Sequence, residues 1–410
     1  MKVKRLSGLA LGCFLLVIGC GHLSAQAKTA SVISVKSPGQ KVELKIELKN
    51  QISYSIYFDS KEIISPSPVS LTINDNIVLG KRPVLENVSR TSVNDKILPA
   101  VREKRAVVVD RYEQVNLKFR GNFGLIFRVY DDGVAYRFYT GYRVPIKIRA
   151  EEATFTFPDN YHVYFPFITS LHTSFESTYS YLPLKDIGPD RFGYAPVVVE
   201  LNDGFKVAVT DVAVDDYPGM FLTGNNEGLA RLSGKFAAYP AEEELRQGSD
   251  RELEVVREAN YLAETRGNRQ YPWRLVLLAE NDAQLVSSDL VYRLSLPTEL
   301  KDTTWIKPGK VAWDWWNALN LFGVDFKSGI NTETYKYYAD FASKYGLEYI
   351  ILDEGWSDPA DLFKINPKLN LEEVVRYAES KEVGVILWCV WYTLDQQMDR
   401  ALDYFQRIGV

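Results

Sequence analysis

The sequence has 410 residues, of which 46% are hydrophobic and 25% are charged, and its formal net charge is −5. This length exceeds one compact core and this balance of apolar and charged residues excludes a disordered chain, so we expect two globular domains. The acidic charge makes nucleic acid and anionic lipid poor partners.

The N-terminus has the composition of an export signal. Three basic residues among the first five precede an apolar run over residues 6–19, which is too short to span a bilayer comfortably. Two processing sites are open: Ala25-Gln26-Ala27 would end a signal peptide over 1–27, whereas a lipoprotein signal over 1–19 would leave Cys20 to carry a lipid anchor. We therefore expect an exported protein, periplasmic or associated with the outer membrane, with no membrane span after the signal.

Alternating apolar and polar residues dominate the sequence from about residue 31 to 297. Val42, Leu44 and Ile46 alternate with charged residues, which predicts a strand with one face in a core. Asp131-Asp132-Gly133 separates two such runs, which predicts a hairpin whose glycine supplies a positive φ. Strand patterns without helical patterns between them favour a large β-sandwich.

Cysteine and histidine are too sparse to define a scaffold or a metal centre. After the signal, Cys389 is the only cysteine, so no disulfide framework is expected. The histidines are His22, His162 and His172, and none has a Cys or His partner at ligand spacing. The sequence therefore gives no support for zinc.

After about residue 300 the pattern changes to strands that alternate with helices. Strands are expected over Lys310–Trp316, Leu347–Asp353 and Val383–Trp391, and the second is a continuous apolar run, as in a sheet covered on both faces. An open doubly wound sheet could begin in this way, but no glycine-rich phosphate turn follows any of the strands. We therefore favour a barrel of βα units.

Capping residues mark the helices between these strands. Asn331 and Asn370 stand where two helices should begin, and Gly346 stands where the first should end. A capping box formed by Thr393 and Gln396 is expected to open a last helix.

These patterns together predict a multidomain β and α/β protein. An N-terminal β-sandwich domain over 28–300 is followed, over 301–410, by the first three βα units of an incomplete (β/α)8 TIM barrel. A closed barrel needs eight strands, so we expect the catalytic barrel to be truncated in this sequence.

Aromatic and acidic residues gather where the three βα strands should end, which is the end of a barrel that carries the active site. Indole faces stack on sugar rings and carboxylates hydrogen-bond to hydroxyl groups, so this mixture suits a neutral carbohydrate. Packing of the indoles and capping of turns by the carboxylates are the alternative roles. The candidate substrate-binding residues are Trp313, Asp314, Trp316, Asp353, Glu354, Trp356 and Trp388.

Asp353 and Glu354 are neighbours on one strand end. Their side chains should diverge, whereas a pair of glycosidase carboxylates faces each other across the substrate. We therefore interpret both as ligand-binding residues and not as a catalytic pair.

Three segments carry a family resemblance that extends over nearly the whole chain after the signal. Val311-Ala312-Trp313-Asp314-Trp315-Trp316-Asn317, Leu352-Asp353-Glu354-Gly355-Trp356 and, in the β region, Phe127-Arg128-Val129-Tyr130-Asp131-Asp132-Gly133 resemble glycoside hydrolase family 97. The resemblance implies an exported bacterial α-glycosidase that depends on calcium and acts on an oligosaccharide or α-galactoside. Its Leu-Asp-Glu-Gly-Trp segment is closer to the retaining α-galactosidases than to the inverting α-glucosidases.

The resemblance also implies where the chemistry lies. The nucleophile and the acid/base would follow later barrel strands, beyond residue 410, so we expect no catalytic residue in this chain and no activity of the chain by itself. The segment Ser174–Tyr179 is similar to a loop that supplies a calcium ligand, which makes Glu176 the candidate metal ligand.

Two other functions remain open. An inverting α-glucosidase of the same family is the alternative within the enzyme class, and a non-catalytic carbohydrate-binding protein is the alternative outside it. The sequence downstream of Val410 would discriminate between an enzyme and a binding protein, because later barrel strands would have to supply an Asp and a Glu.

Overall fold

The computed structural model describes residues 32–410 except 75 and 102–103. The predicted signal peptide over 1–27, the alternative lipoprotein signal over 1–19 and the lipid anchor at Cys20 lie outside the described residues and stay predictions. Within the described ranges, no helix is both long enough and apolar enough to cross a membrane.

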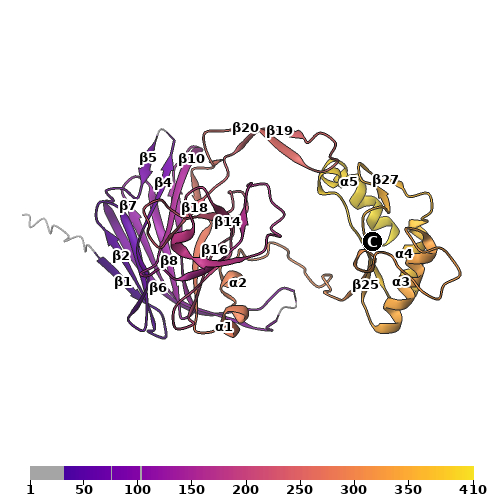
Figure 1. Cartoon of the computed structure of the whole chain (residues 1–410), viewed down its shortest axis with the longest axis horizontal. Helices are drawn as coiled ribbons and strands as arrows, with labels where there is room; N and C mark the ends of the chain where they lie inside the picture. Colours follow the sequence, from indigo (N-terminus) through magenta and orange to yellow (C-terminus); the bar gives the residue numbers. More distant parts are fainter. Residues whose placement is uncertain (1–31, 75, 102–103) are drawn as a thin grey trace, which may run out of the picture.

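The N-terminal part consists of two large antiparallel sheets (Figure 1), which confirms the predicted all-β region. The first sheet contains β1 (Val32–Lys36), β2 (Val42–Leu48), β3 (Ile52–Phe58), β4 (Lys61–Ile73), β5 (Ile77–Leu79), β10 (Ile146–Thr156), β12 (Phe167–Ile168), β14 (Phe192–Tyr194), β17 (Phe221–Thr223), β18 (Arg231–Lys235) and β21 (Ala263–Thr265). Its order is β1-β2-β3-β4-β10-β18-β17-β14-β12, with β21 beside β10 and β5 beside β4.

The second sheet contains β6 (Leu85–Ile97), β7 (Val108–Phe119), β8 (Phe123–Tyr130), β9 (Gly133–Gly141), β11 (His162–Phe165), β13 (Ser180–Pro183), β15 (Val197–Glu200), β16 (Lys206–Val212), β22 (Asn268–Gln270) and β23 (Trp273–Ala279). Its order is β13-β11-β15-β16-β23-β9-β8-β7-β6, with β22 beside β9. A short 3-10 helix, η1 (Leu184–Asp186), follows β13.

One hydrophobic core lies between the two sheets. Val42, Leu44 and Ile46 of β2 are fully buried in it, which confirms the predicted alternation. The ring of Tyr54 in the first sheet lies 6.3 Å from that of Phe127 and 5.3 Å from that of Tyr136, both in the second sheet. Aromatic contacts across the layers therefore join the sheets into one domain.

The β8–β9 hairpin forms where it is predicted, but not for the predicted reason. Gly133 lies inside β9, where it pairs with Tyr130, and its φ is not positive. A Cβ at this position would lie 2.6 Å from the carbonyl oxygen of Val276 and 2.7 Å from Leu290. The glycine is therefore required by close packing against β23 and not by the turn.

Two short helices follow β23, α1 (Asp282–Ser287) and α2 (Leu290–Leu294), so the prediction of strands alone up to residue 297 is wrong there. Leu290 and Leu294 are buried against the outer face of the second sheet. Helices of one to two turns contain too few residues for a helical period to be visible in the sequence.

A two-stranded hairpin leaves the β domain before β23. It consists of β19 (Pro240–Leu245) and β20 (Leu253–Glu258), and it belongs to neither large sheet. Figure 1 shows this hairpin extending from the β domain towards the helices of the C-terminal part.

The C-terminal part is a small parallel α/β region. Its sheet has the order β24-β25-β28, formed by β24 (Val311–Trp313), β25 (Tyr349–Leu352) and β28 (Gly384–Leu387). Its other elements are η2 (Trp315–Asn317), α3 (Thr332–Tyr345), β26 (Ser357–Asp358), β27 (Asp361–Ile365), α4 (Leu371–Ser380) and α5 (Trp391–Ile408).

The capping predictions for the first two helices are confirmed. The side chain of Asn331 accepts a hydrogen bond from the backbone of Thr334, and that of Asn370 accepts one from Glu373. Gly346 ends α3 in the left-handed conformation, with a φ of 67°.

The predicted capping box is wrong. Helix α5 already begins at Trp391, and the hydroxyl of Thr393 donates to the carbonyl of Pro359 at 2.5 Å instead of capping the helix. The third strand ends at Leu387, four residues earlier than predicted. Residues 388–390 connect β28 to α5 and belong to neither element. The run that resembles one strand in the sequence is therefore divided between β28, this connection and the first residue of α5.

Candidate functional site

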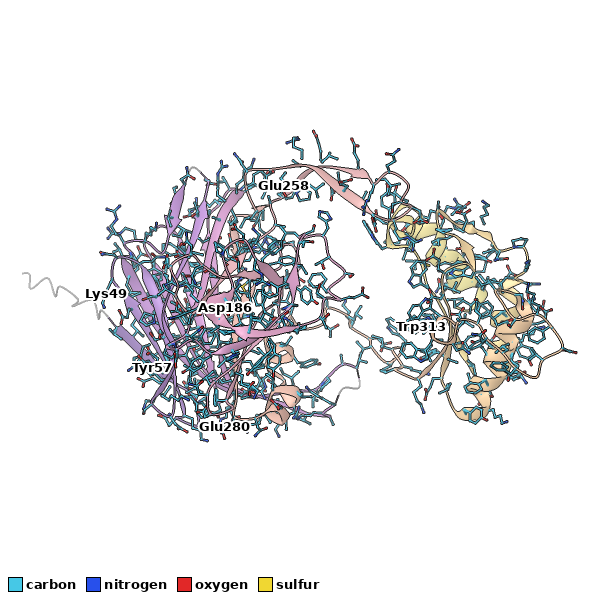
Figure 2. The ribbon with its side chains drawn as sticks, viewed as in Figure 1. Lys49, Tyr57, Asp186, Glu258, Glu280 and Trp313 are labelled. Atoms are coloured by element: carbon cyan, nitrogen blue, oxygen red, sulfur yellow. The ribbon has the colours of Figure 1, made fainter. Side chains whose placement is uncertain are left out.

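The predicted site residues lie at one edge of the parallel sheet. Residues Val311, Tyr349 and Gly384 are in register, so the chain leaves all three strands at the same edge. Figure 2 shows Trp313, the last residue of β24, on the side of the α/β region that faces the β domain. The residues that follow β25 and β28 belong to the same edge.

Three indole rings are exposed at this edge. Trp313, Trp315 and Trp316 are 39%, 61% and 78% exposed. The ring of Trp313 lies 5.1 Å from that of Trp315 and 6.4 Å from that of Trp316, with interplanar angles of 29° and 23°. The rings of Trp315 and Trp316 are tilted by 50°. Exposed indole faces offer flat apolar surfaces to the C–H groups of a sugar ring.

Asp314 stands between Trp313 and Trp315 in the sequence but is buried. It is 2% exposed, and its Oδ2 accepts a hydrogen bond from the hydroxyl of Tyr335 at 2.7 Å. Burial raises the pKa of Asp314 above its usual range. Its Oδ1 has no hydrogen-bond partner among the described residues. Asp314 is therefore placed to support the loop and does not form part of its exposed surface.

The backbone after the indole rings is strained. Ala318 and Leu319 both adopt left-handed conformations, with φ of 54° and 57°. The amide of Leu319 donates to the carbonyl of Asp314 at 2.9 Å, and the hydroxyl of Tyr338 donates to the side chain of Asn317. Such strain persists only where the surroundings hold it, and it is frequent at ligand-binding loops.

The two carboxylates after β25 have separate partners, as their adjacent positions predict. Asp353 accepts a hydrogen bond from the indole Nε1 of Trp313, with its Oδ2 at 2.6 Å. Glu354 accepts two hydrogen bonds from Arg251, at 2.8 Å and 2.7 Å. This arrangement separates the two side chains and does not form a facing catalytic pair.

Arg251 comes from the turn of the β19–β20 hairpin, which belongs to the β domain. Its guanidinium lies 5.6 Å from the ring of Trp388 and also pairs with Asp250. The hydrogen bonds from Arg251 hold the pKa of Glu354 below its usual range. A residue far from the strand ends in the sequence therefore reaches the predicted site.

Trp356 has a packing role in this structure. It is 1% exposed, its Nε1 donates to the carbonyl of Trp388 at 2.7 Å, and its ring meets Phe405 edge-on. The crevice that Trp356 and Trp388 share with Glu354 has a volume of only about 10 Å³, which is too small for a sugar ring.

Glu176 lies in an exposed loop of the β domain. Among the described residues, no group of three or more His, Cys, Asp or Glu side chains could hold a metal ion. Calcium takes six to eight oxygen ligands, so Glu176 and the residues around it do not fit a calcium ion by themselves.

The sequence interpretation missed three contributors to this edge. Trp315 stacks on Trp313, Tyr335 hydrogen-bonds to Asp314, and Arg251 binds Glu354. Trp315 could have been included, because it stands in the same run of aromatic residues. For Arg251 the sequence offers a turn signal but nothing that indicates where the turn lies in space.

A β domain joined to parallel β/α units, with exposed indoles beside carboxylates at the strand ends, is an arrangement suited to a carbohydrate-active protein. The family model "Glycosyl-hydrolase 97 N-terminal" matches residues 35–297, and the model "Glycoside hydrolase 97" matches residues 315–410. The chain therefore belongs to glycoside hydrolase family 97, as the resemblance predicted.

Two curated relatives extend this result. The retaining alpha-galactosidase of Bacteroides thetaiotaomicron is 35% identical over 97% of this chain and 61% of the relative. The probable retaining alpha-galactosidase of Streptomyces bingchenggensis is 24% identical over 98% of this chain and 59% of the relative. The chain thus spans about 60% of the length of these relatives.

Solved structures agree on the fold. A glycoside hydrolase family 97 enzyme from Pseudoalteromonas sp. strain K8, in complex with acarbose, has a TM-score of 0.76 and 22% identity, covering 92% of this chain and 58% of that one. A beta-arabinopyranosidase has a TM-score of 0.74 and 22% identity, covering 92% of this chain and 61% of that one.

Proposed function

We propose that this chain is part of an exported retaining α-galactosidase whose strand-end edge binds the galactosyl ring. The observation that carries the proposal is the hydrogen-bonded pair of Trp313 and Asp353, which sets a partly exposed indole face beside a carboxylate. One face of a galactose ring presents several C–H groups together, and its hydroxyl groups project around them. The indole would contact the C–H groups and the carboxylate would accept hydrogen bonds from the hydroxyl groups.

The three parallel strands are proposed to be the first three of a (β/α)8 barrel, packed next to a β-sandwich. In such barrels the substrate lies at the carboxyl ends of the strands, where Trp313, Asp353 and Trp388 are found. The identity of 35% with a retaining alpha-galactosidase supports galactoside over glucoside as the substrate class. Export to the periplasm or outer membrane is part of the same proposal and rests on the sequence alone.

The described residues are assigned to binding and orientation. Trp313 and Trp316 would support the ring, Asp353 would accept a hydroxyl hydrogen bond, and Asp314 would hold the loop from below. Retaining hydrolysis needs two carboxyl groups about 5 Å apart across the anomeric carbon. Asp314 is buried and Asp353 and Glu354 are held apart by separate partners. The nucleophile and the acid/base are therefore proposed to lie outside the described residues.

An assay of the complete gene product beside the 410-residue chain tests this function. The complete product should hydrolyse an aryl α-galactoside much faster than the matching α-glucoside, and NMR should show the α-anomer as the first product. The 410-residue chain should show no hydrolysis. Preference for the glucoside, with the β-anomer as the first product, would indicate an inverting α-glucosidase. If both forms bind the sugar and neither hydrolyses it, the protein is a binding protein.

Calcium dependence is a separate proposal that rests on the family resemblance. Glu176 alone offers too few oxygens, so the measurement that decides it is hydrolysis by the complete product before and after treatment with a chelator. Full activity after calcium removal would contradict it.

A further inference from the structure

The turn of the β19–β20 hairpin places a guanidinium on the strand-end edge of the α/β region. Nη1 and Nη2 of Arg251 lie 2.8 Å and 2.7 Å from the two carboxylate oxygens of Glu354. This is the fork geometry in which a guanidinium binds both oxygens of one carboxylate, and it fixes the plane of that carboxylate as well as its position.

The guanidinium itself is held from a second side. Nε of Arg251 donates to Asp250 at 2.6 Å and Nη2 donates to the same carboxylate at 3.1 Å. One positive group therefore stands between two carboxylates, close to the ring of Trp388. Asp250 restrains the side chain of Arg251. Arg251 therefore loses little further conformational entropy when it binds Glu354.

Glu354 keeps the capacity to bind a ligand. Each carboxylate oxygen can accept about two hydrogen bonds, and Arg251 uses one on each oxygen. The side chain of Glu354 is exposed, so the remaining acceptor positions are open to solvent. Two acceptors in a fixed plane match two neighbouring hydroxyl groups of a sugar, and the paired charge favours a neutral ligand.

We propose that Arg251 is a positioning residue of the sugar site: the β domain uses its hairpin to hold Glu354 in the plane in which it accepts two hydroxyl groups of a neutral sugar ring. The inference rests on the proposed galactoside site for its ligand. The site is then formed jointly by the β domain and the α/β region.

The hairpin offers a matched control. Arg246 pairs with Glu252 at 2.7 Å near the same turn, and both side chains are well exposed. Replacing Arg246 removes the same kind of charge and the same kind of ion pair from the same hairpin, but leaves the contact with Glu354 in place.

The experiment compares the 410-residue chain with its R251A, R251K and R246A variants by calorimetric titration with methyl α-galactoside. R251A should weaken binding by roughly tenfold or more, since a hydrogen bond to a charged group is lost. R251K should weaken it less, because a lysine gives a point charge but no fork. R246A should change it by less than about twofold. Equal weakening by R251A and R246A would overturn the proposal.

A second measurement needs no sugar and separates this inference from the proposed function. The carboxyl carbon of Glu354, assigned with E354Q, is titrated by NMR in the wild type and in R251A. The facing charged groups are Arg251, which lowers the pKa of Glu354, and Asp250, which raises it. The pKa should therefore rise in R251A and not in R246A. Absence of sugar binding in the wild type would reject the galactoside site, whereas an unchanged pKa in R251A would reject the positioning role.

Discussion

The indole of Trp313 donates a hydrogen bond to Asp353 across 40 positions of sequence, with a distance of 2.6 Å from Nε1 to Oδ2. The bond joins the ends of β24 and β25, so the orientation of the indole depends on a carboxylate of the neighbouring strand. An exposed ring that is fixed in this way is pre-organised for a ligand, which lowers the entropy that binding has to overcome.

Replacing Asp353 by alanine should weaken binding of methyl α-galactoside by roughly tenfold, because a charged acceptor and the orientation of Trp313 are lost together. Calorimetric titration measures the change. Asp340→Ala is the control, since Asp340 pairs with Lys381 on the helical surface. Equal affinities of Asp353→Ala and the wild type would show that this carboxylate does not bind the sugar.

Replacing Trp316 by alanine should weaken sugar binding by roughly three- to tenfold with little change in stability, because the ring is largely exposed and stacks only on its neighbours. Trp305→Ala removes another exposed indole, in the segment before β24, and should leave the affinity unchanged. A similar loss of affinity in both variants would argue against a specific stacking role for Trp316.

Tyr335→Phe should lower the free energy of unfolding of the α/β region by about 1–3 kcal/mol, since it leaves the buried carboxylate of Asp314 without its hydroxyl donor. Burial raises the pKa of Asp314, and the hydroxyl of Tyr335 opposes this rise. A carboxyl with a raised folded-state pKa costs stability in full above that pKa, and the cost disappears as the pH falls below the unfolded-state pKa. The loss in Tyr335→Phe should therefore be larger at neutral than at acid pH in urea unfolding. A loss that grows towards acid pH would contradict this assignment.

Arg274→Met should destabilise the β domain by about 3–5 kcal/mol, because it leaves two carboxylates in the interior without their cation. Arg274 is held by Glu151 at 2.7 Å and 2.8 Å and by Asp211 at 3.3 Å. Lys41→Ala breaks the exposed pair with Glu280 and should change the stability of the domain much less, because solvent screens that pair. Thermal unfolding followed by near-ultraviolet circular dichroism compares the stabilities of the two variants. Equal losses of stability would show that the buried contacts of Arg274 contribute no more than an exposed ion pair.

Local signals in the sequence predicted local structure well. Asn331, Asn370 and Gly346 act through hydrogen bonds or backbone angles within a few residues, so the sequence alone predicts their roles at helix ends. The same kind of local signal predicts that Thr393 caps α5, and this prediction is wrong. Its hydroxyl donates instead to the carbonyl of Pro359, which is distant in sequence. A capping motif therefore predicts a helix start only where no residue distant in sequence binds the capping side chain.

The site was predicted only in part for the same reason. Trp313 and Asp353 follow strands whose ends meet at one edge, so their proximity could be inferred from the βα pattern. Trp356 also follows a strand, but it is buried: its Nε1 donates to the backbone carbonyl of Trp388 and its ring packs against Phe405 of α5. Arg251 could not be predicted, since its contact with Glu354 depends on where a long hairpin lies in space.

The indole and carboxylate edge after β24 and β25 is proposed to bind a galactosyl ring. Calorimetric titration of the 410-residue chain with methyl α-galactoside, beside the same titration of Trp313→Ala, tests it most directly. We predict saturable binding of one sugar per chain in the wild type, no detectable binding in Trp313→Ala, and weaker binding of methyl α-glucoside. The absence of wild-type binding, or binding that Trp313→Ala retains in full, would contradict it.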